Sequence, residues 1–164
     1  MNDAARIVVD ALRLTPHPEG GFYRETFRAT ALVSTAYGER SASTAIYFLL
    51  PGGDISALHR VRSDEVWHHY AGDPVEVHTV TEAGIHTVEV LGSDVTAGQQ
   101  PQFVVPGGVW QAAVTRGSGF ALCGCTVAPG FDFADFEMPS RAALLARYPA
   151  LRGVLERVTR AEAG

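Results

Sequence analysis

A succession of short strand-like runs constrains the fold of this chain most strongly. From residue 22 to residue 126 the runs are rich in β-branched and aromatic residues, and turn-forming Gly, Pro and Asp separate them. The runs are GFYRETFRA, STAIYFLL, DEVWHHYA, VEVHTVTE, IHTVEVLG, QFVVPG, WQAAVT and GFALCGCTVA. Because no helical pattern interrupts them, they predict an all-β fold, an antiparallel sandwich or barrel.

Helical patterns flank the strand-rich part. Residues 3–14 place apolar side chains at helical spacing, and the following TPHPEGG breaks that helix. Near the other end, Ser140 is placed to cap a helix over RAALLARY, and Pro149 ends it before a second helical piece, LRGVLERVTRA. The 164 residues suit one domain. We therefore expect a single domain over 1–164, with a barrel core over 20–128 and C-terminal helices over 140–162.

Charge and hydropathy exclude several classes of function. The formal net charge is -5 and the chain has no lysine, so we expect no nucleic-acid partner. No apolar run is long enough to span a bilayer, and the N-terminal stretch has acids and no basic start, unlike a secretion signal. We expect a cytoplasmic protein with no membrane partner. Cys123 and Cys125 are interpreted as small buried residues rather than as a metal or redox site.

The stretch HRVRSDEVWHHYAG, residues 59–72, gathers ionisable side chains beside a tryptophan. Its spacing resembles the first motif of the cupin superfamily, in which Gly, His-x-His, Glu and Gly recur at set intervals. The residues at these positions are Gly53, His59, Val61, Glu65 and Gly72.

A second cupin motif, Pro-x-Gly followed after two residues by His, is similar to Pro106, Gly108 and Gln111. The longer stretches HPEGGFYRET, DEVWHHYAGDP, VVPGGVWQAA and CTVAPGFDF resemble the cupin subgroup DUF985, also called Cupin_5. This resemblance implies a double-stranded β-helix, or jelly-roll, barrel with a pocket inside it, and commonly a homodimer. It implies no settled reaction.

The departures from the metal-binding cupins concern the ligands. In those proteins three histidines and one glutamate hold a transition-metal ion. Here Val61 replaces the second histidine and Gln111 the late one, and an amide is a poor ligand for such ions. We expect no tightly held metal and no cofactor; a bound metal would lie on His59, Glu65 and Gln111. His69 lies about 13 Å beyond Glu65 along the strand, too far for a further ligand.

Strand alternation predicts which side chains face the interior. The predicted inner set is His59, Val61, Glu65, Trp67, His69 and Gln111. Polar residues inside a small barrel are costly unless they find partners, so this set favours a pocket that holds a small molecule. The alternative is that His59 and Glu65 form a buried hydrogen-bonded pair that only organises the barrel mouth.

Other candidates for ligand contact have alternatives too. Trp67 is either core packing or a flat pocket wall, and Arg24 is either a surface charge or a ligand contact. Tyr47 is favoured as a core residue but, like Tyr23, is a candidate acid. His68 is expected on the opposite face of the sheet.

Three functions remain open. The first is a cupin that binds a small ring-shaped or sugar-like molecule without catalysis. The second is a metal-independent sugar epimerase or isomerase, with His59 as the base, Glu65 fixing its tautomer and Tyr23 or Tyr47 as the acid. The third is a metal-dependent dioxygenase or decarboxylase, against which the missing ligands count.

Overall fold

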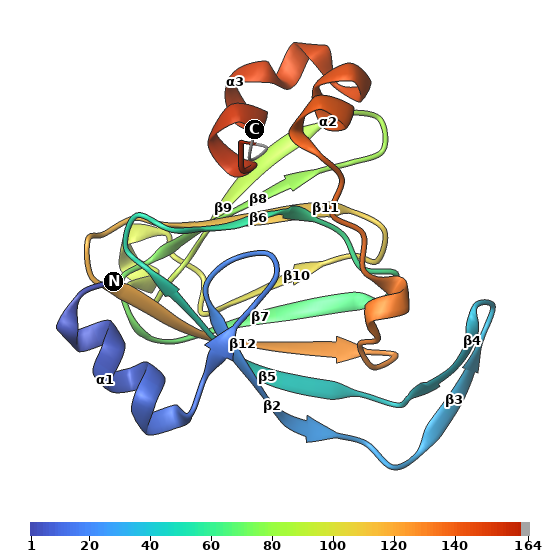
Figure 1. Cartoon of the computed structure of the whole chain (residues 1–164), viewed down its shortest axis with the longest axis horizontal. Helices are drawn as coiled ribbons and strands as arrows, with labels where there is room; N and C mark the ends of the chain where they lie inside the picture. Colours follow the sequence, from blue (N-terminus) through green and yellow to red (C-terminus); the bar gives the residue numbers. More distant parts are fainter. Residues whose placement is uncertain (162–164) are drawn as a thin grey trace.

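The computed structural model describes residues 1–161, and its strands form two antiparallel sheets and a separate hairpin (Figure 1). The six-stranded sheet has the order β1 (Thr15–Pro16), β2 (Phe22–Arg28), β5 (Thr44–Pro51), β12 (Phe120–Ala128), β7 (Asp64–Gly72) and β10 (Gln102–Val105). The four-stranded sheet has the order β6 (Ile55–His59), β11 (Trp110–Thr115), β8 (Val75–Val80) and β9 (His86–Leu91). The hairpin consists of β3 (Leu32–Thr35) and β4 (Gly38–Ser41), and a short 3₁₀ turn, η1 (Val95–Ala97), precedes β10.

Sequence-distant strands lie side by side in these sheets, as a jelly-roll requires. β12 pairs antiparallel with both β5 and β7, and β11 lies between β6 and β8. The all-β jelly-roll with flanking helices is therefore confirmed. One detail differs from the expected barrel, because within residues 1–161 the two sheets face each other as separate hydrogen-bonded ladders and do not close into one.

The main core lies between the two sheets. Its buried side chains come from the inward positions of both, and its largest members, Phe48 and Trp67, meet edge to face with ring centroids 5.6 Å apart. Burying a large apolar side chain stabilises a fold by about 1.5–3 kcal/mol, so this layer holds the sheets together. Cys123 and Cys125 belong to it as unpaired, buried thiols, as the sequence predicted.

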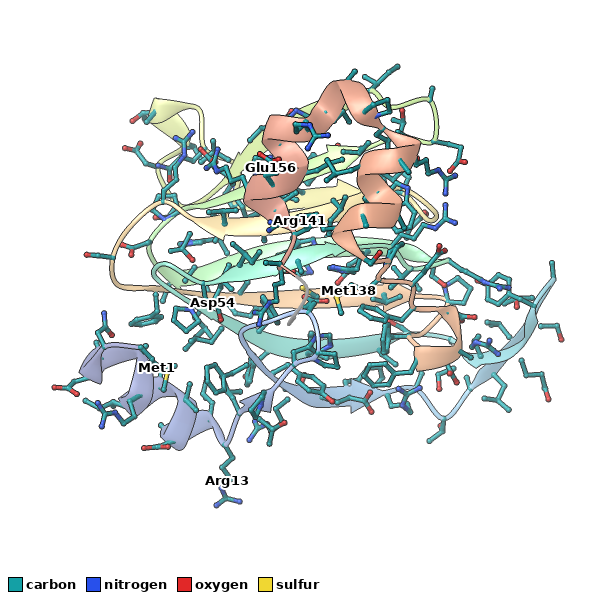
Figure 2. All side chains as sticks on the ribbon, turned by 45° about the horizontal axis from the view of Figure 1, so that its top comes forward. Met1, Arg13, Asp54, Met138, Arg141 and Glu156 are labelled. Atoms are coloured by element: carbon teal, nitrogen blue, oxygen red, sulfur yellow. The ribbon has the colours of Figure 1, made fainter. Side chains whose placement is uncertain are left out.

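Helices cover the outer faces of the sheets. α1 (Asp3–Leu12) lies on β5, and α2 (Arg141–Arg147), η3 (Pro149–Leu151) and α3 (Arg152–Val158) cover the four-stranded sheet (Figure 2). Ser140 caps α2 as expected, since its hydroxyl accepts from Ala143 N at 3.2 Å. The last helix ends at Val158, earlier than the predicted 162, and residue 162 lies outside the described residues. No helix within 1–161 is long and apolar enough to cross a bilayer.

Two connections bridge the sheets and shape the space between them. The loop over residues 17–21 joins β1 to β2 in the six-stranded sheet and reaches β6 of the other sheet, where Ala57 N donates to Glu19 O at 2.7 Å. Gly20 is needed there, because its φ is +116° and a Cβ would lie 2.1 Å from the Ile55 carbonyl oxygen.

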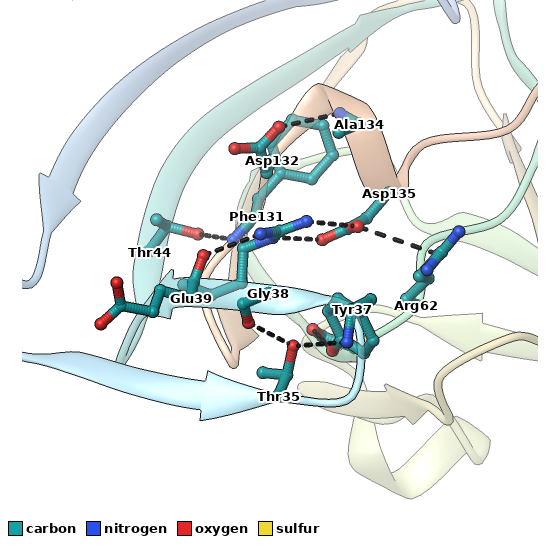
Figure 3. A network of polar contacts seen from close by, with 12 residues as sticks. Thr35, Tyr37, Gly38, Glu39, Thr44, Arg62, Phe131, Asp132, Ala134 and Asp135 are labelled. Carbon is teal, nitrogen blue, oxygen red and sulfur yellow. Dashed lines mark hydrogen bonds and ion pairs between the residues drawn. The ribbon is translucent and has the colours of Figure 1, made fainter.

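The second connection is the segment 131–137, which contains the 3₁₀ turn η2 (Phe133–Asp135). Arg60 and Glu137 exchange two backbone hydrogen bonds of 2.9 and 3.0 Å. Asp135 accepts from Arg40 on β4 at 2.7 and 2.8 Å and lies 3.8 Å from Arg62 (Figure 3). The segment is thus fixed to Arg60, directly after β6, on one side and to the hairpin on the other.

Candidate functional site

A cavity of about 450 Å³ opens between the sheets, beneath the two bridging connections. Its wall combines ionisable, apolar and aromatic side chains from both sheets and both connections. The lining residues are His17, Glu19, Tyr23, Glu25, Arg28, Thr44, Ile46, His59, Val61, Glu65, Cys125, Val127, Phe131, Asp132, Phe133 and Phe136. Among the residues predicted from the sequence, the structure brings Tyr23, His59, Val61 and Glu65 to this wall.

Two imidazoles converge on one carboxyl oxygen of Glu19. Glu19 Oε2 lies 3.2 Å from His59 Nε2 and 3.4 Å from His17 Nδ1. The other carboxyl oxygen, Oε1, accepts from the Ser56 hydroxyl at 2.8 Å. Glu19 is 6% exposed and His59 2%, so these groups have little access to bulk water. The loop over 17–21 therefore brings two ionisable residues to the histidine predicted on β6.

Burial controls protonation in this cluster. It raises the pKa of Glu19 to about 8, although the hydrogen bond from Ser56 opposes the shift. It lowers the pKa of His17 to about 4, with a further lowering by His59, and it also lowers the pKa of His59. Near neutral pH the favoured state is therefore a protonated Glu19 beside two neutral imidazoles.

Glu65 belongs to a different hydrogen-bonded chain. Gln111 Nε2 donates to Glu65 Oε2, and Trp67 Nε1 donates to Gln111 Oε1 at 2.8 Å. Burial raises the pKa of Glu65, and the nearby His59 opposes the rise. This differs from the expected role of Glu65, because the group that contacts His59 Nε2 is Glu19, and Ala57 O accepts from His59 Nδ1 at 2.8 Å.

The remaining predicted contacts lie away from the cavity wall. Trp67 and Gln111 are 1% and 0% exposed and stand behind Glu65, so Trp67 is a core residue and no flat wall. Tyr47 packs beneath α1 with Arg24 over its ring, 5.6 Å from the centroid, on the outer face of the sheet. His69 donates from Nε2 to Asp73 O at 3.1 Å at the far end of β7.

His68 faces outward, as expected. Its ring stacks on Tyr70, and its Nε2 lies 3.1 Å from Thr126 Oγ1 on the outer face of the six-stranded sheet. The position of His68 makes it a suitable control for changes in the cavity.

Sequence reasoning missed an aromatic wall and a charged pair at the cavity. Phe131, Phe133 and Phe136 come from the segment after β12, and the Phe136 ring stacks on His59 with centroids 5.3 Å apart. Arg28 donates to both carboxylate oxygens of Glu25, at 2.9 and 2.7 Å. The available signal was the motif FDFADFEMP, with its alternating aromatic residues and acids.

The donor set does not fit the metal that many cupins hold. Both polar atoms of Gln111 are taken by Trp67 and Glu65, Val61 offers no donor atom, and His59 Nε2 faces Glu19. Within residues 1–161 no group of three or more His, Cys, Asp or Glu side chains has a geometry that could hold a metal ion.

Comparison with known proteins agrees with the fold and with the motifs. The structure resembles protein SO0799 from Shewanella oneidensis, with a TM-score of 0.90 and 39% identity over 99% of this chain and all of that one. It also resembles a hypothetical protein from Leishmania major, with a TM-score of 0.91 and 33% identity over 97% of this chain and all of that one.

One more distant likeness in structure supports the fold alone, and one relative is found by sequence. An oxalate decarboxylase from Bacillus subtilis matches with a TM-score of 0.56 and 16% identity over 87% of this chain, which corresponds to 36% of that chain. In sequence, the uncharacterized protein YML079W of Saccharomyces cerevisiae is 30% identical over 145 residues, which cover 78% of this chain and 71% of that protein.

The model of the family described as Cupin superfamily (DUF985), or Cupin_5, matches residues 6–139. This range includes both bridging connections, every strand and the cavity between the sheets. The chain therefore belongs to the DUF985 (Cupin_5) family of the cupin superfamily.

Proposed function

We propose that the chain binds a small, uncharged, ring-shaped polar molecule in the cavity between its sheets. The observation that carries this proposal is the cavity itself, whose wall combines three phenylalanine rings with a buried polar cluster against which two of them pack. Its volume of about 450 Å³ is in the usual range for small-molecule sites. Aromatic rings stack on a flat ligand, while hydrogen-bonding groups at the floor fix its edge.

The charges around the cavity favour a neutral ligand over an anion. The one arginine on the wall, Arg28, already forms a bidentate pair with Glu25. Burial lowers the pKa of both His17 and His59, so neither imidazole carries a positive charge near neutral pH. A carboxylate or phosphate would thus enter without a free cationic partner, which is costly in a partly dry site.

A thermal-shift screen followed by calorimetry tests this proposal. We expect neutral sugars or nucleobases to raise the melting temperature, whereas anionic keto acids leave it unchanged. Phe133→Ala removes a ring that is 52% exposed, so the fold should survive while binding weakens by about 1 kcal/mol. Phe27→Ala is the matched control, because Phe27 is 54% exposed and lies outside the cavity wall. Equal effects of the two changes would contradict the proposal.

A second candidate function is metal-independent acid–base catalysis, as in an isomerase or epimerase. The contact of 3.2 Å between Glu19 and His59 favours it, because a carboxyl with a pKa of about 8 beside a neutral imidazole can exchange a proton near neutral pH. Tyr23 lies on the same cavity wall as a candidate acid. Incorporation of solvent deuterium into a bound sugar, lost in Glu19→Gln, would support this function. A sugar that binds without exchange would contradict catalysis and support the binding function.

We also propose that the protein is cytoplasmic and that it forms a homodimer. A cytoplasmic location is supported by the two buried cysteines, which are unpaired as in a reducing compartment. A homodimer is supported by the free edge of β10, where Val104 is 52% exposed, because an uncovered strand edge favours pairing with another chain.

A further inference from the structure

We propose that His17, rather than His59, is the imidazole that contacts the ligand, and that its Nε2–H donates to a carbonyl or other acceptor on the ring. The inference rests on the proposed binding function and names the chemistry of the ligand edge that the site recognises. The contact with the ligand, which the motif spacing assigned to His59, is thereby assigned to His17.

His59 has no ring nitrogen left for a ligand. A carbonyl oxygen only accepts, so the contact of 2.8 Å between His59 Nδ1 and Ala57 O requires the proton on Nδ1. The other nitrogen, Nε2, faces Glu19 Oε2 at 3.2 Å. Phe136 covers the ring face, and the residue is only 2% exposed.

His17 has the opposite arrangement. The backbone N–H of Glu19 donates to His17 Nδ1 at 3.3 Å, so the neutral ring carries its proton on Nε2. Nε2 has no hydrogen-bond partner within residues 1–161, while the ring lines the cavity. Tyr23 meets the ring edge to face at 4.5 Å and Phe133 stacks on it at 6.1 Å, which fixes its direction.

Glu19 maintains both tautomers. In their neutral forms, His59 Nε2 and His17 Nδ1 both present lone pairs, and both lie within 3.4 Å of Glu19 Oε2. A protonated Oε2 satisfies His59, because its hydroxyl donates to His59 Nε2 while Oε1 accepts from Ser56, and His17 Nδ1 accepts from the backbone N–H of Glu19. Glu19 is therefore a positioning residue that leaves His17 Nε2–H as the donor available to the cavity.

Long-range ¹H–¹⁵N NMR of the imidazole rings tests the tautomers in the free protein at pH 7, with His17→Asn and His59→Asn used for assignment. The expected result is a neutral ring with the proton on Nε2 for His17 and on Nδ1 for His59. A charged His17, or a His17 ring with its proton on Nδ1, would overturn the inference without reference to any ligand.

Titration with 2-pyrrolidone, a neutral ring with a carbonyl acceptor, then tests the contact. We expect the His17 Nε2 signal to shift while His59 stays unchanged, and His17→Phe to weaken binding about tenfold, the scale of one lost hydrogen bond. The matched His68→Phe, on the outer sheet face, should bind as the wild type does. Shifts of the cavity phenylalanines without a shift of His17 would overturn the inference alone. No shift at any cavity residue would count against the proposed binding function and the inference together.

Discussion

Replacing Glu19 by glutamine should stabilise the fold, and by an amount that depends on pH. The pKa of this buried carboxyl is raised from its ordinary value of 4.5 to about 8. An unfolded chain releases the proton above pH 4.5, so folding at higher pH has to take a proton up. A raised pKa in the folded state gives stability that is fully present below pH 4.5 and is lost as the pH rises through 8.

The size of the effect follows from that interval. At about 1.4 kcal/mol per pKa unit, taking up the proton costs at most about 5 kcal/mol at high pH and almost nothing at pH 4.5. Glutamine removes this cost. Its amide nitrogen can donate toward His17 and His59, and its oxygen can accept from Ser56, so the variant mimics the protonated acid.

Urea unfolding of wild type and Glu19→Gln at pH 5 and at pH 7.5 measures the difference. The free energy of unfolding of the variant, relative to that of the wild type, should be about 3 kcal/mol higher at pH 7.5 than at pH 5. Glu39→Gln is the control, because Glu39 is exposed on β4 and should show little change at either pH. Equal destabilisation of Glu19→Gln at both pH values would refute the reasoning, since it would indicate an ionised Glu19 paired with a charged imidazole.

Three further predictions address the core network, the metal and the assembly. Gln111→Ala leaves the buried Trp67 N–H and Glu65 without their shared partner, so urea unfolding should show a loss of about 2 kcal/mol or more; no loss would contradict the role of Gln111. Protein purified without added metal should carry well under one transition-metal ion per chain, because no three His, Cys, Asp or Glu side chains among residues 1–161 are placed to coordinate one ion. Elemental analysis that finds about one ion per chain would overturn this. Light scattering should give about twice the mass of the 17.5 kDa chain, and a monomer mass at micromolar concentration would contradict the homodimer.

The fold was predictable because its signals are local. Alternation along DEVWHHYA placed Glu65 and Trp67 on the inner face, and the structure agrees. Alternation assigns a face but no depth, so it could not show that Trp67 lies behind the cavity and that His69 lies beyond its end. The hydrogen bond from Trp67 Nε1 that helps to orient Gln111 joins side chains 44 positions apart in the sequence, so no local pattern reveals it.

The site was only half predictable for a similar reason. His59 and Glu65 lie on strands and followed from the motif spacing, whereas His17 and Glu19 lie in a loop of prolines and glycines that has no periodicity. Their place at the cavity depends on the hydrogen bond from Ala57 N to Glu19 O, a contact between distant parts of the chain. The residue that we expect to contact the ligand therefore lies in a segment, TPHPEGG, that the sequence pattern marked as a helix break and, through HPEGGFYRET, as part of the family resemblance, but not as part of the site.

A crystal structure of the protein soaked in a mixture of neutral sugars and nucleobases tests the central claim most directly. We predict density for a ring-shaped molecule against Phe131 and Phe133, with an acceptor atom within hydrogen-bond distance of His17 Nε2. Density found only outside the cavity, or a cavity that holds nothing but water under saturating conditions, would contradict the account. A metal ion bound between His17, Glu19 and His59 would contradict it as well.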